Sequence, residues 1–327
     1  MKKYLPFLLW FFRLGVGLLF IFSGLIKAND TIGFAYKLEE YFELFGMPFL
    51  KTLAWSISAF ICVFEIALGA AILVGYKFVE STWSLLAMII FFTILTGYSA
   101  ITGKVTDCGC FGDAIPLTPW QSFYKDLILF VGIIILFIGR KTVTPWIGNK
   151  LSGGITWGLS ILSSVFVAYT VMHLPVMDFR PYKPGTDLKK CTTEYIESEG
   201  KIKCKDYFPF KIECGEDEFA GNTLMIISYD LEKADEEGIK NSVTLFHSLA
   251  GTPVKVIGGT GSGGDIRDSY KLKYSIPYCL SPQDMTMLKT MIRSNPGFIL
   301  LKEGRVKKMW HYNDIPDKAA VLQSLSS

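Results

Sequence analysis

Long apolar runs separated by short polar stretches fill the first half of the chain. Each run is about 20 residues long, which is the length that an α-helix needs to cross a bilayer. The predicted spans are Leu5 to Ile26, Phe49 to Val74, Trp83 to Ile101, Pro119 to Ile138 and Gly154 to His173. Five spans would place the two ends of the chain on opposite sides of a membrane.

Between the first two spans, apolar and charged residues alternate at helical spacing. Phe34, Leu38, Tyr41 and Phe42 fall on one side of a helix over Thr31 to Phe45, and Lys37 and three glutamates fall on the other. This pattern predicts an amphipathic helix that lies along the membrane interface. The first span is expected to be a retained anchor, because it contains Arg13 and no small-residue cleavage site follows it.

The pattern changes after about Asp178. An irregular, proline-containing linker over residues 178–221 is followed by alternating strand and helix signals from Asn222 onward. Buried strands are expected at Thr223 to Ser228 and Val254 to Ile257, helices at Glu232 to Ala250, Ile266 to Leu272 and Asp284 to Ile292, and a closing hairpin at Phe298 to Lys302 and Val306 to Trp310 with a final helix after Pro316. We therefore expect a membrane α-helical bundle followed by an α/β domain.

Composition agrees with this division. Half of the 327 residues are hydrophobic and the mean hydropathy is +0.34, which excludes an ordinary soluble protein. The net charge is only +3 and no basic block is present, so no nucleic-acid partner is expected. The predicted domains are a four-helix membrane domain (1–139), a cytoplasmic loop with the fifth span (140–177), a periplasmic linker (178–221) and the α/β domain (222–327).

The placement of lysine and arginine near the span ends indicates the orientation. With the N-terminus inside, the inner side holds Lys2, Lys3, Lys77, Arg140, Lys141 and Lys150, and the outer side holds Lys27, Lys37, Lys51 and Lys104. The bias favours a cytoplasmic N-terminus. In a bacterial inner membrane, the α/β domain and the connection between the third and fourth spans would then face the oxidising periplasm.

That connection carries the strongest candidate for chemistry. Cys108-Gly109-Cys110 is flanked by Asp107 and Asp113, where the chain re-enters the membrane. A disulfide closed over one intervening residue departs from relaxed geometry and is more easily reduced, which suits electron exchange. The alternative is a tight glycine turn with incidental or statically bonded cysteines. No metal site is expected, because zinc prefers four ligands and the three histidines lie far away in the sequence.

Ionisable residues inside the spans should face the bundle interior, because each would cost several kcal/mol against lipid. Arg13 and Glu65 are candidates for a structural pair. Asp126 lies about two helical turns below Pro119 and close to the cysteine hairpin, where it would accept protons during thiol chemistry. Cys62 is expected to be a small packing residue.

Four cysteines follow the spans, at Cys191, Cys204, Cys214 and Cys279. A structural disulfide between Cys191 and Cys204 is plausible, but four cysteines allow three full pairings and the sequence does not choose among them.

Residues 292–310, which read IRSNPGFILLKEGRVKKMW, resemble the C-terminal half of a thioredoxin fold, and the resemblance covers about 222–325. It implies that Pro296 after Asn295 is cis and lies beside a peptide-binding edge. Where thioredoxins carry Cys-x-x-Cys, this chain has Ser228-Tyr229-Asp230-Leu231-Glu232-Lys233. Thioredoxin-like dithiol activity therefore does not carry over.

The membrane half resembles the DoxX/MauE family. The resemblance rests on Phe22 to Lys27, Glu65 to Gly69, and Asp107 to Asp113 with Trp120 and Asp126, and it covers about 5–139. The whole chain is similar to DoxX-family proteins of Bacteroidetes that carry a thioredoxin-like tail. The resemblance implies an inner-membrane protein of periplasmic thiol or disulfide metabolism, as MauE is thought to help a disulfide-rich partner mature.

Two classes of function follow from these patterns. The first is a thiol–disulfide oxidoreductase or accessory in which Cys108 and Cys110 exchange electrons with a periplasmic or secreted client, Asp113 or Asp126 handles protons, and a quinone is a conceivable electron acceptor without a visible motif. The second is a non-catalytic adaptor whose thioredoxin-like domain docks an envelope partner. A small-solute transporter is a third hypothesis, which the absence of visible repeats disfavours.

Overall fold

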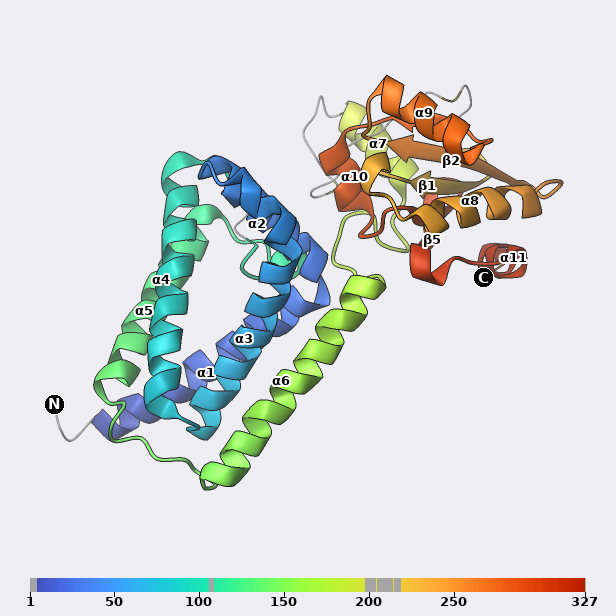
Figure 1. Ribbon diagram of the computed structural model, residues 1–327. Coiled ribbons are helices and arrows are strands. Elements are labelled where there is room, and N and C mark those ends of the chain that lie inside the picture. Colours follow the sequence, from blue (N-terminus) through green and yellow to red (C-terminus); the bar gives the residue numbers. More distant parts are fainter. Residues whose placement is uncertain (1–4, 106–108, 198–203, 205–213, 215–218, 327) are drawn as a thin grey trace. The chain divides into compact units, whose positions relative to one another are not determined.

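The computed structural model describes residues 5–105, 109–197, 204, 214 and 219–326, and the chain divides after Val171 into two compact units (Figure 1). The first unit is helical and the second is built around a β-sheet. Each unit is considered by itself.

Five helices of the first unit are long and apolar enough to cross a membrane. Their bounds are α1 (Leu5–Asn29), α3 (Ala54–Val74), α4 (Phe78–Thr102), α5 (Pro119–Ile138) and α6 (Asn149–Met172). All five predicted spans are present, with ends that differ by a few residues from those expected. Side chains that point away from the bundle are largely apolar, including Phe60, Ile94 and Ile128, as lipid contact requires. The protein is a multi-pass membrane protein.

The predicted amphipathic helix is α2 (Thr31–Leu44), and a 3-10 turn, η1 (Pro48–Leu53), leads from it into α3. Asp30 caps α2 by accepting a hydrogen bond from the Gly33 N–H at 2.9 Å. The apolar side of α2, which includes Leu38 and Tyr41, is buried in the core of the bundle. The helix thus packs against the spans along the face that the sequence pattern defines.

Glycines allow α1 and α3 to approach closely. A Cβ atom on Gly69 would lie 2.7 Å from the Gly17 carbonyl oxygen and 2.9 Å from the Ile21 nitrogen, both backbone atoms of α1. Small residues at such crossings let helix backbones pack without side chains between them. The antiparallel register that results places Gly24 beside Cys62 and Glu65, and Arg13 beside Ile72.

The start of α5 is fixed by its sequence. Thr118 and Gln121 form a capping box, in which each side chain accepts a hydrogen bond from the other residue's backbone N–H, and Pro119 occupies the first helical position. This cap ends the irregular connection that follows α4, which contains a single 3-10 turn, η2 (Gly112–Ala114), within its described part. It determines where Lys125 and Asp126 enter the bundle.

The second unit contains a five-stranded sheet with the order β3-β2-β1-β4-β5. Its strands are β1 (Asn222–Ile227), β2 (Val254–Thr260), β3 (Leu280–Pro282), β4 (Gly297–Lys302) and β5 (Arg305–His311). The first three are parallel, and β4 and β5 run antiparallel to their neighbours. With the helices between them, this is the thioredoxin topology that the resemblance implied.

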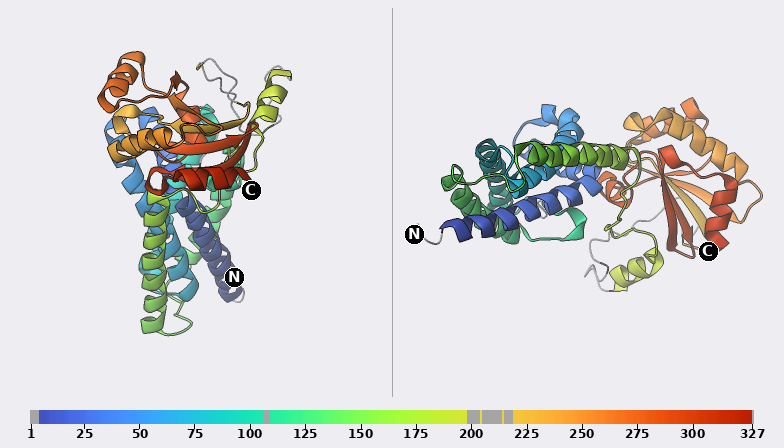
Figure 2. Two further views of the ribbon diagram at one scale, coloured as in Figure 1. Left: turned by 90° about the vertical axis from the view of Figure 1, so that its right-hand side faces the viewer. Right: turned by 90° about the horizontal axis from the view of Figure 1, so that it is seen from below.

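Helices cover both faces of the sheet (Figure 2). On one face α7 (Leu188–Glu197) and α10 (Met285–Met291) pack over Met225 and Ile227, and on the other α8 (Glu236–Ser248) and α11 (Lys318–Ser326) pack over Leu224 and Ile226. The remaining helix is α9 (Gly264–Tyr274), and short 3-10 turns lie at η3 (Leu231–Lys233) and η4 (Tyr312–Asp314). Because successive strand residues alternate between two covered faces, β1 reads as a continuous apolar run.

The segment 178–221 is not the irregular linker that its prolines suggested, as far as the structure describes it. It contains α7, and Tyr182, Leu188 and Cys191 are buried in the core of the α/β unit. Arg180 is also buried, where it pairs with Asp178 at 2.6 Å. The α/β unit therefore begins near Met172 rather than at residue 222.

Candidate functional site

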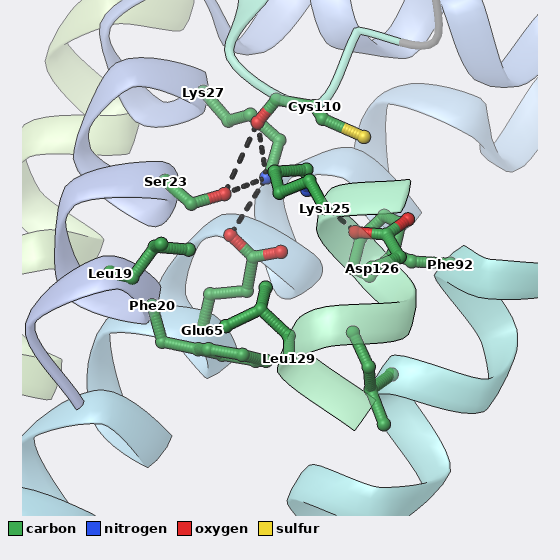
Figure 3. A pocket seen from close by; sticks show the side chains of 11 residues that line it. Leu19, Phe20, Ser23, Lys27, Glu65, Phe92, Cys110, Lys125, Asp126 and Leu129 are labelled. Atoms are coloured by element: carbon green, nitrogen blue, oxygen red, sulfur yellow. Dashed lines mark hydrogen bonds and ion pairs between the residues drawn. The ribbon is translucent and has the colours of Figure 1, made fainter. Parts of the chain in front are cut away.

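A small pocket lies between the helices of the bundle where the cysteine connection meets them (Figure 3). We call it the Cys110 pocket. Its volume accessible to the centre of a water molecule is about 20 Å³, enough for a water but far below the several hundred Å³ of a cofactor pocket. The lining residues are Leu19, Phe20, Ser23, Lys27, Glu65, Ile89, Phe92, Cys110, Lys125, Asp126 and Leu129.

Lys27 is the centre of a buried polar network on one side of this pocket. Three oxygens lie within 3.0 Å of its Nζ: Ser23 Oγ at 2.6 Å, Glu65 Oε2 at 2.9 Å and the Cys110 carbonyl oxygen at 3.0 Å. The Ser23 hydroxyl donates a second hydrogen bond to the same carbonyl at 3.2 Å. The contact with Glu65 is an ion pair rather than a well-directed hydrogen bond, because Oε2 has no hydrogen-bond partner of good geometry.

A second ion pair lies on the other side of the pocket. Lys125 Nζ is 2.6 Å from Asp126 Oδ1, and the Thr96 hydroxyl of α4 donates a hydrogen bond to Asp126 Oδ2 at 2.9 Å. Asp126 is almost fully buried, while Lys125 keeps about a fifth of its side chain exposed. The carboxylate is thus held by side chains from two helices, α4 and α5.

The pocket combines a sulfur with balanced charge. Two ammonium groups, two carboxylates and the buried Cys110 side chain line it. Buried charges need partners because their desolvation is costly, and here each has one. An ammonium group stabilises a thiolate, and a carboxylate can accept or return a proton, so these are the group types that thiol–disulfide exchange uses.

The predicted site residues differ in their relation to the pocket. Asp126 and Cys110 line it, whereas Asp113 lies in η2 with an exposed side chain and is not part of the lining. Cys108 and Asp107 lie outside the described residues. Gly109 has a φ of +68°, and a Cβ atom there would lie 3.2 Å from the Lys37 side chain of α2, so a glycine suits this position.

The expected pair of Arg13 and Glu65 does not form. Glu65 pairs with Lys27, and the Arg13 Nε donates to the Ile72 carbonyl at 2.8 Å while its guanidinium stacks 4.3 Å from the Trp146 ring. The antiparallel register explains the difference, because Ile72 lies seven residues beyond Glu65, about 10 Å along α3. Both side chains do face the interior, as predicted.

Cys62 lies one helical turn from Glu65 and is fully buried in the hydrophobic core of the bundle. Its surroundings are those of a packing residue, as the sequence suggested.

In the α/β unit, the Asn295–Pro296 peptide bond is cis. The Asn295 side chain donates to the Asp230 carbonyl at 2.7 Å, in the loop where thioredoxins carry their dithiol. All four cysteines of this unit form disulfides, Cys191 with Cys204 and Cys214 with Cys279. Of the three pairings that the sequence allows, the structure has the one that joins Cys191 to Cys204, and residues 228–233 after β1 contain no cysteine.

Sequence reasoning missed Lys27, Ser23, Lys125 and Thr96. By sequence, Lys27 counts among the charges that orient the chain. Ser23, four residues earlier, shares its helix face, and a carboxylate buried at Glu65 requires a cation as its partner. Lys125 precedes Asp126 directly, and adjacent helical residues do not normally face each other. Only the register of α1 against α3 and of α4 against α5 brings these groups together.

The described residues contain no group of three or more His, Cys, Asp or Glu side chains arranged to hold a metal ion. The Cys110 pocket also does not fit a quinone ring, because its volume is that of a single water.

Comparison with known proteins agrees with the membrane half of this description. Residues 5–139 match the family model of the methylamine utilisation protein MauE, a range that contains α1 to α5 and the Cys110 pocket. The chain is also similar to Protein TlpB of Flavobacterium psychrophilum, with 31% identity over 150 residues, which is 43% of this chain and 39% of that protein. The chain thus matches about two fifths of its relative's length. Its membrane bundle through α5 is MauE-like, and the fifth long helix, α6, and an α/β domain of thioredoxin topology follow it.

Proposed function

We propose that this chain is an inner-membrane protein of periplasmic thiol and disulfide metabolism that exchanges electrons through Cys108 and Cys110. The observation that carries the proposal is that Cys110 lines a buried pocket together with the Lys125–Asp126 ion pair. The match of residues 5–139 to the MauE family supports it, because that family model spans the whole pocket.

The proposed reaction is a balanced exchange. A client thiolate attacks Cys108 of a Cys108–Cys110 disulfide, the bond between the two cysteines breaks, and Cys110 leaves as a thiolate. The second client thiol then attacks the mixed disulfide, which releases Cys108 and leaves the client oxidised. The two client protons end on Cys108 and Cys110, and the chain's disulfide is reduced to two thiols.

The residues around Cys110 have matching roles. Cys110 is buried, which suits a leaving group better than the sulfur that a protein client attacks. The Lys125 ammonium would stabilise the departing thiolate, and Asp126 would carry a proton to it. The thioredoxin-like domain would present clients along the edge beside Asn295 and Pro296.

The redox behaviour of the Cys108–Cys110 pair in membranes tests this proposal. We expect a pair that opens and closes reversibly across a thiol buffer series, with a potential well above about −300 mV, the range below which structural disulfides fall. Cys110→Ser should trap clients on Cys108 as mixed disulfides, whereas Cys108→Ser should trap none. Cys62→Ser is the matched control and should behave like the wild type. A pair that stays bonded throughout, or never bonds, would overturn the proposal.

The alternative is a membrane-anchored adaptor that binds an envelope or secretion partner without catalysis. Two observations favour it: the loop after β1 carries no dithiol, and all four cysteines of the α/β unit are already in disulfides. The same titration separates the two functions, because an adaptor predicts a static pair.

A further inference from the structure

Lys27 contacts the backbone carbonyl of Cys110. Its ammonium group and the Ser23 hydroxyl both donate to the Cys110 carbonyl oxygen, at 3.0 and 3.2 Å. Both donors belong to α1, and they lie one helical turn apart. A carbonyl oxygen can accept two hydrogen bonds, and both of those accepted by the Cys110 carbonyl here come from α1.

These hydrogen bonds determine the direction of the Cys110 side chain. Cys110 lies in an irregular connection, where no helical or sheet ladder fixes the peptide group. In Figure 3 the carbonyl oxygen points toward Ser23 and Lys27, while the sulfur points away from them. Holding the carbonyl therefore orients the side chain that lines the pocket with Lys125 and Asp126.

A purely structural contact would not need charge at this place. Lys27 and Glu65 have 1% and 3% of their side chains exposed, and the lysine lies near the rings of Phe34 and Phe92. Buried ion pairs are often no more stabilising than apolar residues of similar size, because both ions must be desolvated. An ammonium group, however, has three N–H donors, so it can contact a hydroxyl, a carbonyl and a carboxylate at once, as Lys27 does here.

We propose that Lys27 is a positioning residue for thiol–disulfide exchange: with Ser23 it clamps the Cys110 backbone to α1, so that the sulfur faces the Lys125–Asp126 pair. This inference rests on the proposed function for its role in the reaction. The clamp itself is a property of the bundle that is measurable without any exchange.

Alkylation of Cys110 by a maleimide, in a Cys108→Ser background, tests the clamp. A buried thiol reacts only when its segment opens, so loss of the clamp should raise the rate. We expect Lys27→Met with Glu65→Gln, which removes both buried charges, to raise it about tenfold, and Ser23→Ala about threefold. Unchanged rates in both would overturn the proposal, and Ser23→Ala decides alone if the double variant does not fold.

Arg13→Met is the matched control. Arg13 is also a buried cation of α1 that donates to a carbonyl, but its target is Ile72 of α3. This variant should lower the melting temperature and leave the Cys110 alkylation rate unchanged. An increase equal to that of the Lys27 variant would show general loosening and would overturn the positioning role.

The exchange reaction supplies the second readout, with dithiothreitol as the probe and Cys108 present. The Lys27 and Glu65 double variant should reduce about tenfold more slowly than the wild type while remaining folded. A static Cys108–Cys110 pair in the wild type would sink the proposed function alone. Wild-type reduction rates in a variant whose alkylation has risen would sink the positioning role alone.

Discussion

Asp126 shares a contact with the residue directly before it, which a helix does not normally permit. Lys125 reaches it through its long flexible side chain, whose Nζ also lies 5.1 Å from the centroid of the Phe111 ring. The carboxylate is thereby held beside the pocket by Lys125 and Thr96. Its chemical role can be separated from its structural one.

Asp126→Asn keeps the shape of the side chain and a hydrogen-bonding group for Thr96, but removes the charge. We expect reduction of the Cys108–Cys110 pair by dithiothreitol to slow roughly a hundredfold, the size of a typical acid–base contribution. Stopped-flow or quenched alkylation measures the rate. Asp113→Asn is the control, because Asp113 is exposed and lies outside the pocket lining. Equal rates for both variants would remove Asp126 from the mechanism.

The sequence predicted which single residues matter at the pocket better than it predicted their partners. Asp126, Glu65 and Cys110 stand out because each is a polar or reactive group beside long apolar runs. Their partners depend on helix register, which is set by the close approach of Gly17 and Gly69 rather than by any local pattern. This register places Lys27, rather than Arg13, beside Glu65.

His311 makes the stability of the α/β unit depend on pH. Burial lowers the pKa of His311 to about 4, partly offset by Asp314 and Asp235 and reinforced by the neighbouring His173. Its Nδ1 accepts a hydrogen bond from the Asn313 N–H, as a neutral imidazole can. The unfolded chain therefore binds more protons than the folded one between pH 6.5 and 4.

The stabilising contribution of neutral His311 is complete above pH 6.5 and is lost as the pH falls toward 4. We expect the free energy of unfolding to fall by up to about 3 kcal/mol more in the wild type than in His311→Phe over this range. Urea titrations at several pH values measure the difference. Parallel pH profiles for the two proteins would contradict it, since the two proteins differ only at His311.

At the scale of elements, the crossing of α1 and α3 is the contact on which the pocket depends, because these helices carry Lys27 and Glu65. Gly69→Ala would place a Cβ against backbone atoms that cannot move aside. We expect it to destabilise the bundle by about 1–3 kcal/mol. Gly15→Ala is the control, because no atom lies within 4 Å of a Cβ there. Unfolding in a denaturing detergent measures both, and equal stability would argue against a tight crossing.

Most elements were predictable because they carry a strong periodic signal. The spans, α2 and four of the strands follow directly from apolar runs or alternation. The missed ones have weak signals: β3 has three residues and ends in Pro282, and α7 is short and contains four charged residues. The helix expected over Glu232 to Ala250 is divided into the turn η3 and the helix α8, which begins at Glu236. Asp235 caps α8 by accepting a hydrogen bond from the Gly238 N–H.

At the scale of the whole molecule, the two disulfides should contribute unequally to the α/β unit. Cys214 and Cys279 are separated by 65 residues and Cys191 and Cys204 by 13, so closing the longer loop restricts the unfolded chain more. Loop entropy predicts about 4 kcal/mol for the former and about 3 kcal/mol for the latter. Double Cys→Ser variants of each pair, unfolded in urea, should show this order. The reverse order would mean that contacts in the folded unit outweigh loop entropy.

We propose an orientation with a cytoplasmic N-terminus on two features, charge and disulfides. Lys27 is buried in the bundle, so it no longer counts as an outer charge, and the comparison becomes six inner against three outer residues. Disulfides form in oxidising compartments, which also favours a periplasmic α/β unit.

Single exposed cysteines test this orientation in a variant that lacks Cys62, Cys108 and Cys110. A maleimide that does not cross membranes should label Lys318→Cys of α11 in spheroplasts, and Lys141→Cys, in the loop before α6, only after permeabilisation. The opposite result would place the Cys108–Cys110 connection in the reducing cytoplasm. A reducing compartment would not support the oxidation of client thiols by this chain, and the adaptor function would then be favoured.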